Sequence, residues 1–286
     1  MAIENDNFSR ISGTALLCLE ARAKFTDLPY VKEMFNYVYR KTEYCSSLLF
    51  DKIMKNPSSR KRISTLETSY VAINEILMNL NHPVIEIAAG LSPRGLEFSD
   101  KVPYMETDLP DMISLKKEIA GKIKPRSSHY FASLNIIDKE SFYYFFKNLP
   151  PDFDGKPVAV VSEGLMMYFS EREKVQMRDN LAGLSKIHNN AVYWVTTDFS
   201  ARDTFQDDIL IDTVMKNVEK STKRKLNRFS SDADVRKFLN SASLKGKVFS
   251  IEHIADKLSC LDKLDIPKDE LRDILHLSRP WVIQKI

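Results

Sequence analysis

From Pro83 onward, short apolar runs rich in β-branched residues alternate with amphipathic helical patterns. This alternation constrains the fold more than any other feature, because it is typical of a parallel sheet whose strands are joined by helical crossovers. We expect strands at Val84–Ala89, Pro103–Glu106, His129–Ser133, Pro157–Ser162 and Ala191–Thr197. The helical patterns between them lie at Asp111–Ile123, Lys139–Asn148 and Glu171–Ile187. The sequence therefore predicts an α/β, doubly wound core.

The segments on either side of this core have other patterns. Before Pro83, apolar residues recur three and four positions apart, which predicts helices at Gly13–Ala23, Val31–Leu49 and, after a basic polar stretch at Pro57–Arg62, Glu67–Leu80. After Asp198 the chain is charged and helical, with a further helix at Asp232–Leu239 and closing strands at Lys247–Ile251 and Trp281–Ile286. We expect one domain over residues 1–286, made of a helical cap (1–82), the core (83–198), a helical insertion or lid (199–245) and closing strands with a helix (246–286).

The charge balance and the cysteines exclude several classes of protein. Forty-two lysines and arginines against 39 aspartates and glutamates give a net charge of +3, too small over 286 residues to indicate a nucleic-acid or membrane surface. Cys18, Cys45 and Cys260 are far apart and odd in number, so we expect neither a disulfide framework nor a metal site.

The amino-terminal segment has no targeting pattern. Met1–Arg10 is polar, and the apolar run Thr14–Leu19 is far shorter than a membrane span. We therefore expect a cytoplasmic protein without a membrane or nucleic-acid partner. A basic cluster in the insertion is typical of a solvated helix face and consists of Lys223, Arg224, Lys225 and Arg228.

The first candidate ligand-binding segment runs from Val84 to Gly95, where an apolar strand leads into a glycine-containing turn. Gly90 lets the backbone approach a ligand closely, and in open α/β sheets ligands bind beyond the carboxyl ends of the strands. The turn lacks a full G-x-G-x-x-G, so the spacing of Gly90 and Gly95 also fits a plain strand-to-helix turn. The candidate cofactor contacts in this segment are Glu86, Gly90, Ser92 and Arg94.

The second candidate segment, Tyr104–Pro110, ends a strand with two carboxylates, Glu106 and Asp108. A nucleotide-binding fold places an acid here to accept hydrogen bonds from ribose hydroxyls. Asp108 would equally suit the capping of a helix that begins near Pro110, without any ligand. Taken together, the first two segments favour a bound nucleotide.

The third candidate segment, Val158–Phe169, is an apolar strand that ends in Glu163 and a glycine. An ionised side chain is costly to bury unless an opposite charge pairs with it, and the ammonium of a ligand would be such a partner. Exposure to solvent or an internal arginine would satisfy Glu163 as well. Tyr168 is either a ligand contact or a core aromatic whose hydroxyl is satisfied internally.

The three segments together resemble the leucine carboxyl methyltransferase family, which includes phosphatase carboxyl methyltransferases and bacterial O-methyltransferases of polyketide or other small-molecule metabolism. The matching residues are Ala89–Gly95, Glu106–Pro110 and Ser162–Tyr168. The last of these, S-E-G-L-M-M-Y, is the most specific, because the family strongly conserves the pattern S/A-E-G-L-L-M-Y. The resemblance covers roughly residues 10 to 200.

This resemblance implies a seven-stranded, Rossmann-like class I methyltransferase fold that binds S-adenosylmethionine. It implies that Gly90 lies near the methionine part, that Asp108, followed by Leu109, lies on the ribose, and that Asn135 and Ile136 lie around the adenine, with Asn135 in place of the family's usual aspartate. It also implies positions for Glu163 and Tyr168 beside the methionine end and the substrate entrance, where we expect the catalytic residues.

The sequence departs from the family at two places. Ser92 stands where many relatives have aspartate, and Glu67-Thr68 stands where they have Arg-Thr. The usual guanidinium for the cofactor's carboxylate is therefore missing, and another cation must replace it. The candidates are Arg94, Arg22 and Lys24, with Arg22 lying in a segment, Ala21–Ala23, that resembles a recurrent amino-terminal family segment.

The reaction that these expectations imply is methyl transfer to the oxygen of a small molecule. Transfer from a sulfonium chiefly requires alignment, so a carboxylate acceptor needs no base, whereas a hydroxyl acceptor would benefit from one. His82 and His129 are expected at the opposite sheet end, which mildly favours a carboxylate or an acidic hydroxyl as the methyl acceptor.

The main alternative function is that of a catalytically silent protein that binds S-adenosylmethionine or serves as a scaffold. The missing G-x-G-x-x-G disfavours a nicotinamide dehydrogenase, and the missing N/D-P-P-Y/F disfavours a nucleic-acid methyltransferase.

Overall fold

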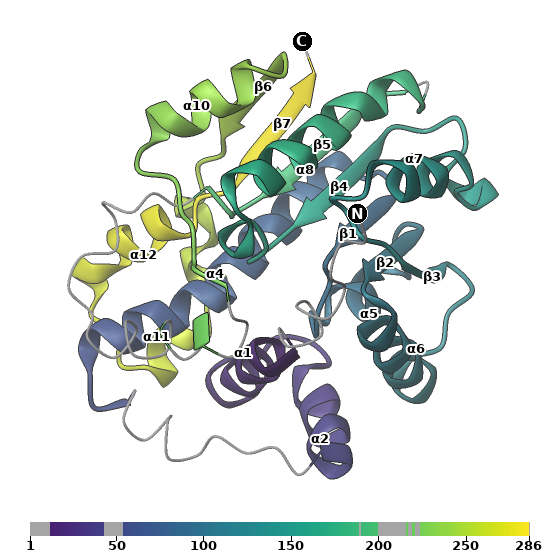
Figure 1. The fold of residues 1–286 in the computed structure, drawn as a ribbon. Coiled ribbons are helices and arrows are strands. Elements are labelled where there is room, and N and C mark those ends of the chain that lie inside the picture. The colour runs from purple at the N-terminus through teal and green to yellow at the C-terminus, as the bar shows by residue number, and fades with distance from the viewer. Residues whose placement is uncertain are drawn as a thin grey trace.

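The computed structural model describes residues 12–42, 54–188, 190–199, 216, 219–220 and 224–285. The chain forms a seven-stranded sheet in the order β3-β2-β1-β4-β5-β7-β6 (Figure 1). The strands are β1 Val84–Ile87, β2 Tyr104–Asp108, β3 His129–Ser133, β4 Val158–Ser162, β5 Val192–Thr196, β6 Leu244–Val248 and β7 Trp281–Lys285. Strands β1 to β5 pair in parallel, and β7 is antiparallel to β5 and β6. This topology confirms the predicted doubly wound, mostly parallel seven-stranded sheet.

Helices precede the sheet and connect its strands. The amino-terminal helices are α1 Ser12–Phe25, α2 Val31–Thr42 and α4 Pro57–Leu80. The helices between the parallel strands are α5 Arg94–Phe98, α6 Pro110–Ile123, α7 Lys139–Lys147 and α8 Glu171–Gly183, with the 3-10 turn η4 Met166–Tyr168 before α8. After β5 the described chain contains α10 Asp232–Asn240, α11 Cys260–Lys263 and α12 Leu271–Leu277. None of the helices within the described ranges combines the length and the apolar character that a membrane crossing requires.

Helices cover both faces of the sheet because successive strand residues point to opposite sides. Ile87 of β1 belongs to an apolar cluster that also contains Phe142 of α7 and Met177 of α8. Val84, three positions earlier on the same strand, belongs to a second cluster with Ile76 of α4. All of β1 is therefore buried, and only the carboxyl end of the strand can present groups to a ligand.

Helix α4 corrects one prediction, since it begins at Pro57 and not at Glu67. Asn56 caps it by accepting a hydrogen bond from the backbone amide of Ser59 at 3.3 Å, and a proline in the first turn needs no amide partner. The basic stretch that we expected to precede the helix forms its first turns.

Two further predictions differ from the structure or lie partly outside it. Strand β6 spans Leu244–Val248, not Lys247–Ile251, because Ile251 packs with Ile254 in a cluster beside the amino-terminal helices. The predicted helix Val31–Leu49 is α2 up to Thr42, and residues 43–49 lie outside the described residues. Part of the predicted insertion also lies outside them, at residues 200–215, 217–218 and 221–223, while α10 and the start of β6 fall within its boundaries.

Candidate functional site

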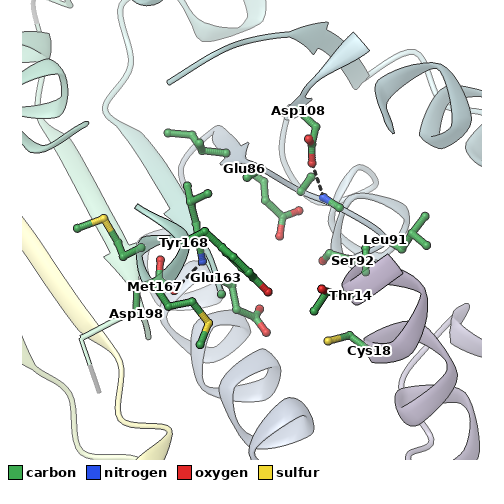
Figure 2. A pocket seen from close by; sticks show the side chains of 18 of the residues that line it. Thr14, Cys18, Glu86, Leu91, Ser92, Asp108, Glu163, Met167, Tyr168 and Asp198 are labelled. Carbon is green, nitrogen blue, oxygen red and sulfur yellow. Dashed lines mark hydrogen bonds between the residues drawn. The ribbon is translucent and has the colours of Figure 1, made fainter. Parts of the chain in front are cut away.

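A cavity of about 1020 Å³ lies at the carboxyl ends of the parallel strands. Every strand from β1 to β5 leads into it, with lining residues at 86–92, 108–112, 133–136, 163–169 and 197–198. Helix α1 and the first half of α4 close it on the opposite side (Figure 2). The three candidate segments thus border one common cavity. The predicted site residues that line it are Arg22, Glu86, Gly90, Ser92, Asp108, Leu109, Asn135, Ile136, Glu163 and Tyr168.

Asp108 holds the glycine turn in place. Its Oδ2 accepts a hydrogen bond from the Gly90 amide at 2.8 Å, drawn in Figure 2, and its Oδ1 accepts one from the Leu109 amide at 2.7 Å. Burial raises the pKa of the Asp108 carboxyl above its ordinary value, although both amides oppose this. Ala88 and Gly90 have φ angles of 51° and 48°, a conformation that glycine adopts readily and alanine does not. The turn is therefore a strained backbone segment braced by a carboxylate.

Gly95 has a different role from Gly90. A Cβ at Gly95 would lie 1.9 Å from Oε1 of Glu106 and 2.4 Å from Nε2 of His129, so no side chain fits there. Glu106 forms an ion pair with Lys116 at 2.8 Å, and its Oε1 lies 2.9 Å from Nε2 of His129. Of the two carboxylates at the end of β2, only Asp108 lines the cavity, and Glu106 lies buried behind it.

Glu163 lies between two arginines. One of its oxygens accepts a hydrogen bond from Arg22 at 2.5 Å and the other from Arg94 at 2.6 Å. Burial alone would raise the pKa of Glu163, but the two guanidinium groups hold it below its ordinary value. Glu163 is therefore ionised at neutral pH. The sequence left open whether an internal arginine pairs with Glu163, and the structure contains two such arginines.

The expectation that Arg94 contacts a cofactor needs correction. Its side chain is fully buried at 0% exposure and does not line the cavity. Besides Glu163, it donates to Glu86 and to the side chain of Asn74, and its guanidinium lies 4.6 Å from the centre of the Tyr70 ring. The sequence spacing predicted that Arg94 lies in the turn. Arg94 begins α5, and its side chain points into the protein, where it connects Glu163 with Glu86 and Asn74.

Tyr168 ends the turn η4 and reaches across the cavity toward α1. Figure 2 shows its ring extending toward Thr14 and Cys18, and Thr14 hydrogen-bonds to it. Burial raises the pKa of Tyr168 to about 12, so the phenol stays protonated at neutral pH. It can donate a hydrogen bond but cannot act as a base under these conditions.

The adenine end of the predicted site lies after β3. Asn135 and Ile136 both line the cavity, and the Ile136 carbonyl accepts a hydrogen bond from Asn180 of α8 at 2.8 Å. The Asn135 side chain accepts a hydrogen bond from the Ile137 amide at 3.3 Å. Its amide nitrogen can still donate to a ligand.

Asp198 is a wall residue that sequence reasoning missed. It follows β5, and its carboxylate accepts hydrogen bonds from the Leu165 amide and the Ser162 hydroxyl, both at 3.1 Å. It thereby fixes the turn after Glu163. An acid directly after a buried strand was the signal that could have identified it, as it did for Asp108.

Two basic side chains of the cavity wall were also missed as site residues. Arg62 comes from the first turns of α4, and Arg228 lies in the segment before α10. Arg228 was assigned to a solvated helix face, yet it lines the cavity, and its neighbour Arg224 forms an ion pair with Glu173 at 2.9 Å. Neither arginine had a sequence pattern of its own that indicated a site.

The departures from the family also have structural roles. Glu67 accepts hydrogen bonds from the Ser259 hydroxyl and the Cys260 amide, both at 2.6 Å, so it anchors the start of α11. Lys24 pairs with Glu20 at 3.0 Å, which leaves Arg22 as the predicted cation that lines the cavity.

Within the described part of the chain, no group of three histidine, cysteine or acidic side chains is placed to hold a metal ion.

Several solved structures share the arrangement of this chain. A DUF574 family protein from Streptomyces avermitilis is 10% identical, and the alignment covers 96% of this chain and 99% of that one with a TM-score of 0.57. PigF, solved with SAH, is 10% identical over 97% of this chain and 72% of its own, with a TM-score of 0.50. An O-methyltransferase family protein from Burkholderia thailandensis is 12% identical over 81% of this chain, which spans 61% of that protein's length, with a TM-score of 0.45. No family model and no curated protein matches the sequence. The chain therefore shares its fold with the DUF574 family protein and with PigF.

Proposed function

We propose that this chain is an S-adenosylmethionine-dependent O-methyltransferase that acts on a small molecule. The observation that carries the proposal is the convergence of Gly90, Asp108 and Glu163 on one cavity at the carboxyl ends of adjacent parallel strands. The fold shared with PigF, which was solved with SAH, supports it. So does the resemblance of the same three segments to the leucine carboxyl methyltransferase family.

We infer the direction of the cofactor from the strand order. The carboxyl ends of β3, β2, β1 and β4 follow one another along the sheet, and they carry Asn135, Asp108, Gly90 and Glu163 in that order. We assign the adenine to Asn135 and Ile136, the ribose to Asp108, and the methionine part to Gly90 and Glu163. A carboxylate offers about four acceptor positions, so Asp108 can accept from a ribose hydroxyl while it holds its two amides.

Arg22 and Glu163 suit the charged end of the methionine part. This end has an ammonium and a carboxylate, and the cavity wall provides one carboxylate and one guanidinium in contact with each other. Glu163 would take the ammonium and Arg22 the carboxylate, which requires their mutual contact to open. Arg94 remains behind Glu163 and keeps it ionised and oriented.

The acceptor end of the cavity favours a carboxylate over a hydroxyl. S-Adenosylmethionine supplies a methyl group activated by its sulfonium, and transfer to a carboxylate oxygen requires no proton removal. Of the described lining residues, none is a histidine, and Tyr168 has a pKa of about 12. The wall also contains Arg62 and Arg228, and the Asp198 carboxylate is engaged with the turn after β4.

Calorimetric titration tests cofactor binding directly. We expect the wild-type chain to bind one molecule of S-adenosylhomocysteine, and Glu163→Gln to bind it about tenfold or more weakly, because a charged hydrogen bond is lost. Glu173→Gln is the matched control, since Glu173 pairs with Arg224 outside the assigned contacts. Absence of heat with both S-adenosylmethionine and S-adenosylhomocysteine at millimolar concentration would overturn the proposal.

Transfer is tested separately with methyl-labelled S-adenosylmethionine and a panel of paired carboxylic acids and alcohols. We expect label in base-labile methyl esters, because an ester of a carboxylate hydrolyses in mild base and a methyl ether does not. Label in ethers alone would refute the carboxylate assignment. Saturable binding without any transfer, also in a metabolite extract, would identify a silent cofactor-binding protein.

A further inference from the structure

A buried cluster of charges lies beneath the glycine turn and is not part of the cavity wall. Lys116 of α6 has a side chain only 3% exposed, and its ammonium contacts Oε2 of Glu106 at 2.8 Å. Oε1 of Glu106 is 2.9 Å from Nε2 of His129, whose side chain is 1% exposed. The cluster therefore joins α6, β2 and β3 behind the site.

Lys116 also reaches the turn itself. Its ammonium donates a hydrogen bond to the backbone carbonyl of Ser92, and the Ser92 hydroxyl accepts one from the Arg94 amide at 3.3 Å. Ser92 lines the cavity, whereas Lys116 does not. The turn is thus held by a charge at each end, the carboxylate of Asp108 on the Gly90 amide and the ammonium of Lys116 on the Ser92 carbonyl.

Stability alone is a weak explanation for this lysine. Burying an ion pair has a desolvation cost that often equals or exceeds the attraction, and an apolar residue of similar volume would fill the same space. A methionine at 116 could pack there, but it could not bind the Ser92 carbonyl. The feature that only a cation supplies is control of the backbone between Gly90 and Ser92.

We propose that Lys116 is a positioning residue that sets the Gly90–Ser92 backbone for the amino-acid part of S-adenosylmethionine. This inference rests on the proposed function. It does not depend on any contact between Lys116 and the ligand, because the ammonium acts through the Ser92 carbonyl. In the assignment above, the adenosine part would lie over β2 and β3, and the amino-acid part would face the Gly90–Ser92 backbone that Lys116 holds.

The test compares two ligands that differ in the amino-acid part. S-Adenosylhomocysteine has it, and 5′-methylthioadenosine retains the thioether and the adenosine without it. For Lys116→Met we expect the affinity for S-adenosylhomocysteine to fall about tenfold or more, the scale of one hydrogen bond to a charged group, and the affinity for methylthioadenosine to change little. Lys117→Met is the matched control, since Lys117 is the exposed neighbour on the same helix, and we expect no change in either affinity.

A second variant separates positioning from folding. Lys116→Met removes the ammonium that pairs with the buried Glu106 and leaves this carboxylate its contact with His129, which destabilises the fold. The double variant Lys116→Met, Glu106→Gln removes both charges, so we expect its thermal stability to recover while its affinity for S-adenosylhomocysteine stays low. Recovery of affinity together with stability, or equal losses for both ligands, would overturn the inference. If the wild-type chain binds neither ligand, the proposed function itself fails.

Discussion

Replacement of Asp108 by asparagine separates two roles that the structure gives to one carboxylate. Asparagine keeps one acceptor oxygen, so it can hold either the Gly90 amide or the Leu109 amide, but its NH₂ group faces the other. The lost charged hydrogen bond costs about 1.5–3 kcal/mol. Part of this cost is offset because burial disfavours the charge of Asp108, as its raised pKa indicates. We expect the free energy of unfolding to fall by about 1–2 kcal/mol.

The affinity for S-adenosylhomocysteine falls further in the same variant, because the ribose loses a charged acceptor and the turn loses its brace. Loss of one such bond corresponds to about 10- to 150-fold weaker binding. Calorimetric titration measures the affinity, and urea denaturation without ligand measures the stability. Asp111→Asn is the control, since Asp111 lines the cavity from the first turn of α6 and is exposed. Wild-type affinity in Asp108→Asn, or an equal loss in Asp111→Asn, would refute the ribose assignment.

Three other changes have defined outcomes. Gly95→Ala forces a Cβ against Glu106 and His129 and should lower the free energy of unfolding by about 1–3 kcal/mol or more; a variant as stable as wild type in urea would contradict this packing. Glu163→Gln leaves Arg22 and Arg94 without their shared carboxylate and should destabilise the fold at neutral pH by up to about 3–5 kcal/mol. Because the folded-state pKa of Glu163 is lowered, the wild-type advantage is complete above the ordinary carboxyl range and disappears as the pH falls through that lowered value, so denaturation curves at acidic pH should converge and a constant gap would contradict it. Tyr168 has a pKa of about 12, so kcat on a carboxylate acceptor should be flat between about pH 6 and pH 9 in both wild type and Tyr168→Phe; a rise with pH that Tyr168→Phe abolishes would instead assign a base role to Tyr168.

The fold was largely predictable because the pattern that specifies a buried strand is local. The predicted strand His129–Ser133 matches β3 at both ends, and the others differ by a few residues. The start of α4 was missed although its signal was present, since Asn56 followed by Pro57 is a capping sequence that the basic residues after it obscured. The predicted position of strand β6 was wrong because Ile251 packs against the helical cap. No local pattern distinguishes that contact from sheet pairing.

The site was predictable only where the chain topology collects residues. Carboxyl ends of parallel strands meet at one edge, so Asp108 and Glu163 were expected in one place and lie there. The partners of Glu163 could not be read from spacing, because Arg22 lies 141 positions away on α1. Arg94 was placed on the cavity since its position follows the turn, but the direction of its side chain depends on how α5 packs against α4.

A crystal structure with S-adenosylhomocysteine bound tests most directly whether consecutive strand ends hold an adenosyl cofactor. The account predicts the adenine beside Asn135 and Ile136, ribose hydroxyls within hydrogen-bond distance of Asp108, and the amino-acid end between Glu163 and Arg22 with their mutual contact opened. A ligand seated elsewhere, or one whose ribose and ammonium touch neither carboxylate, would contradict it.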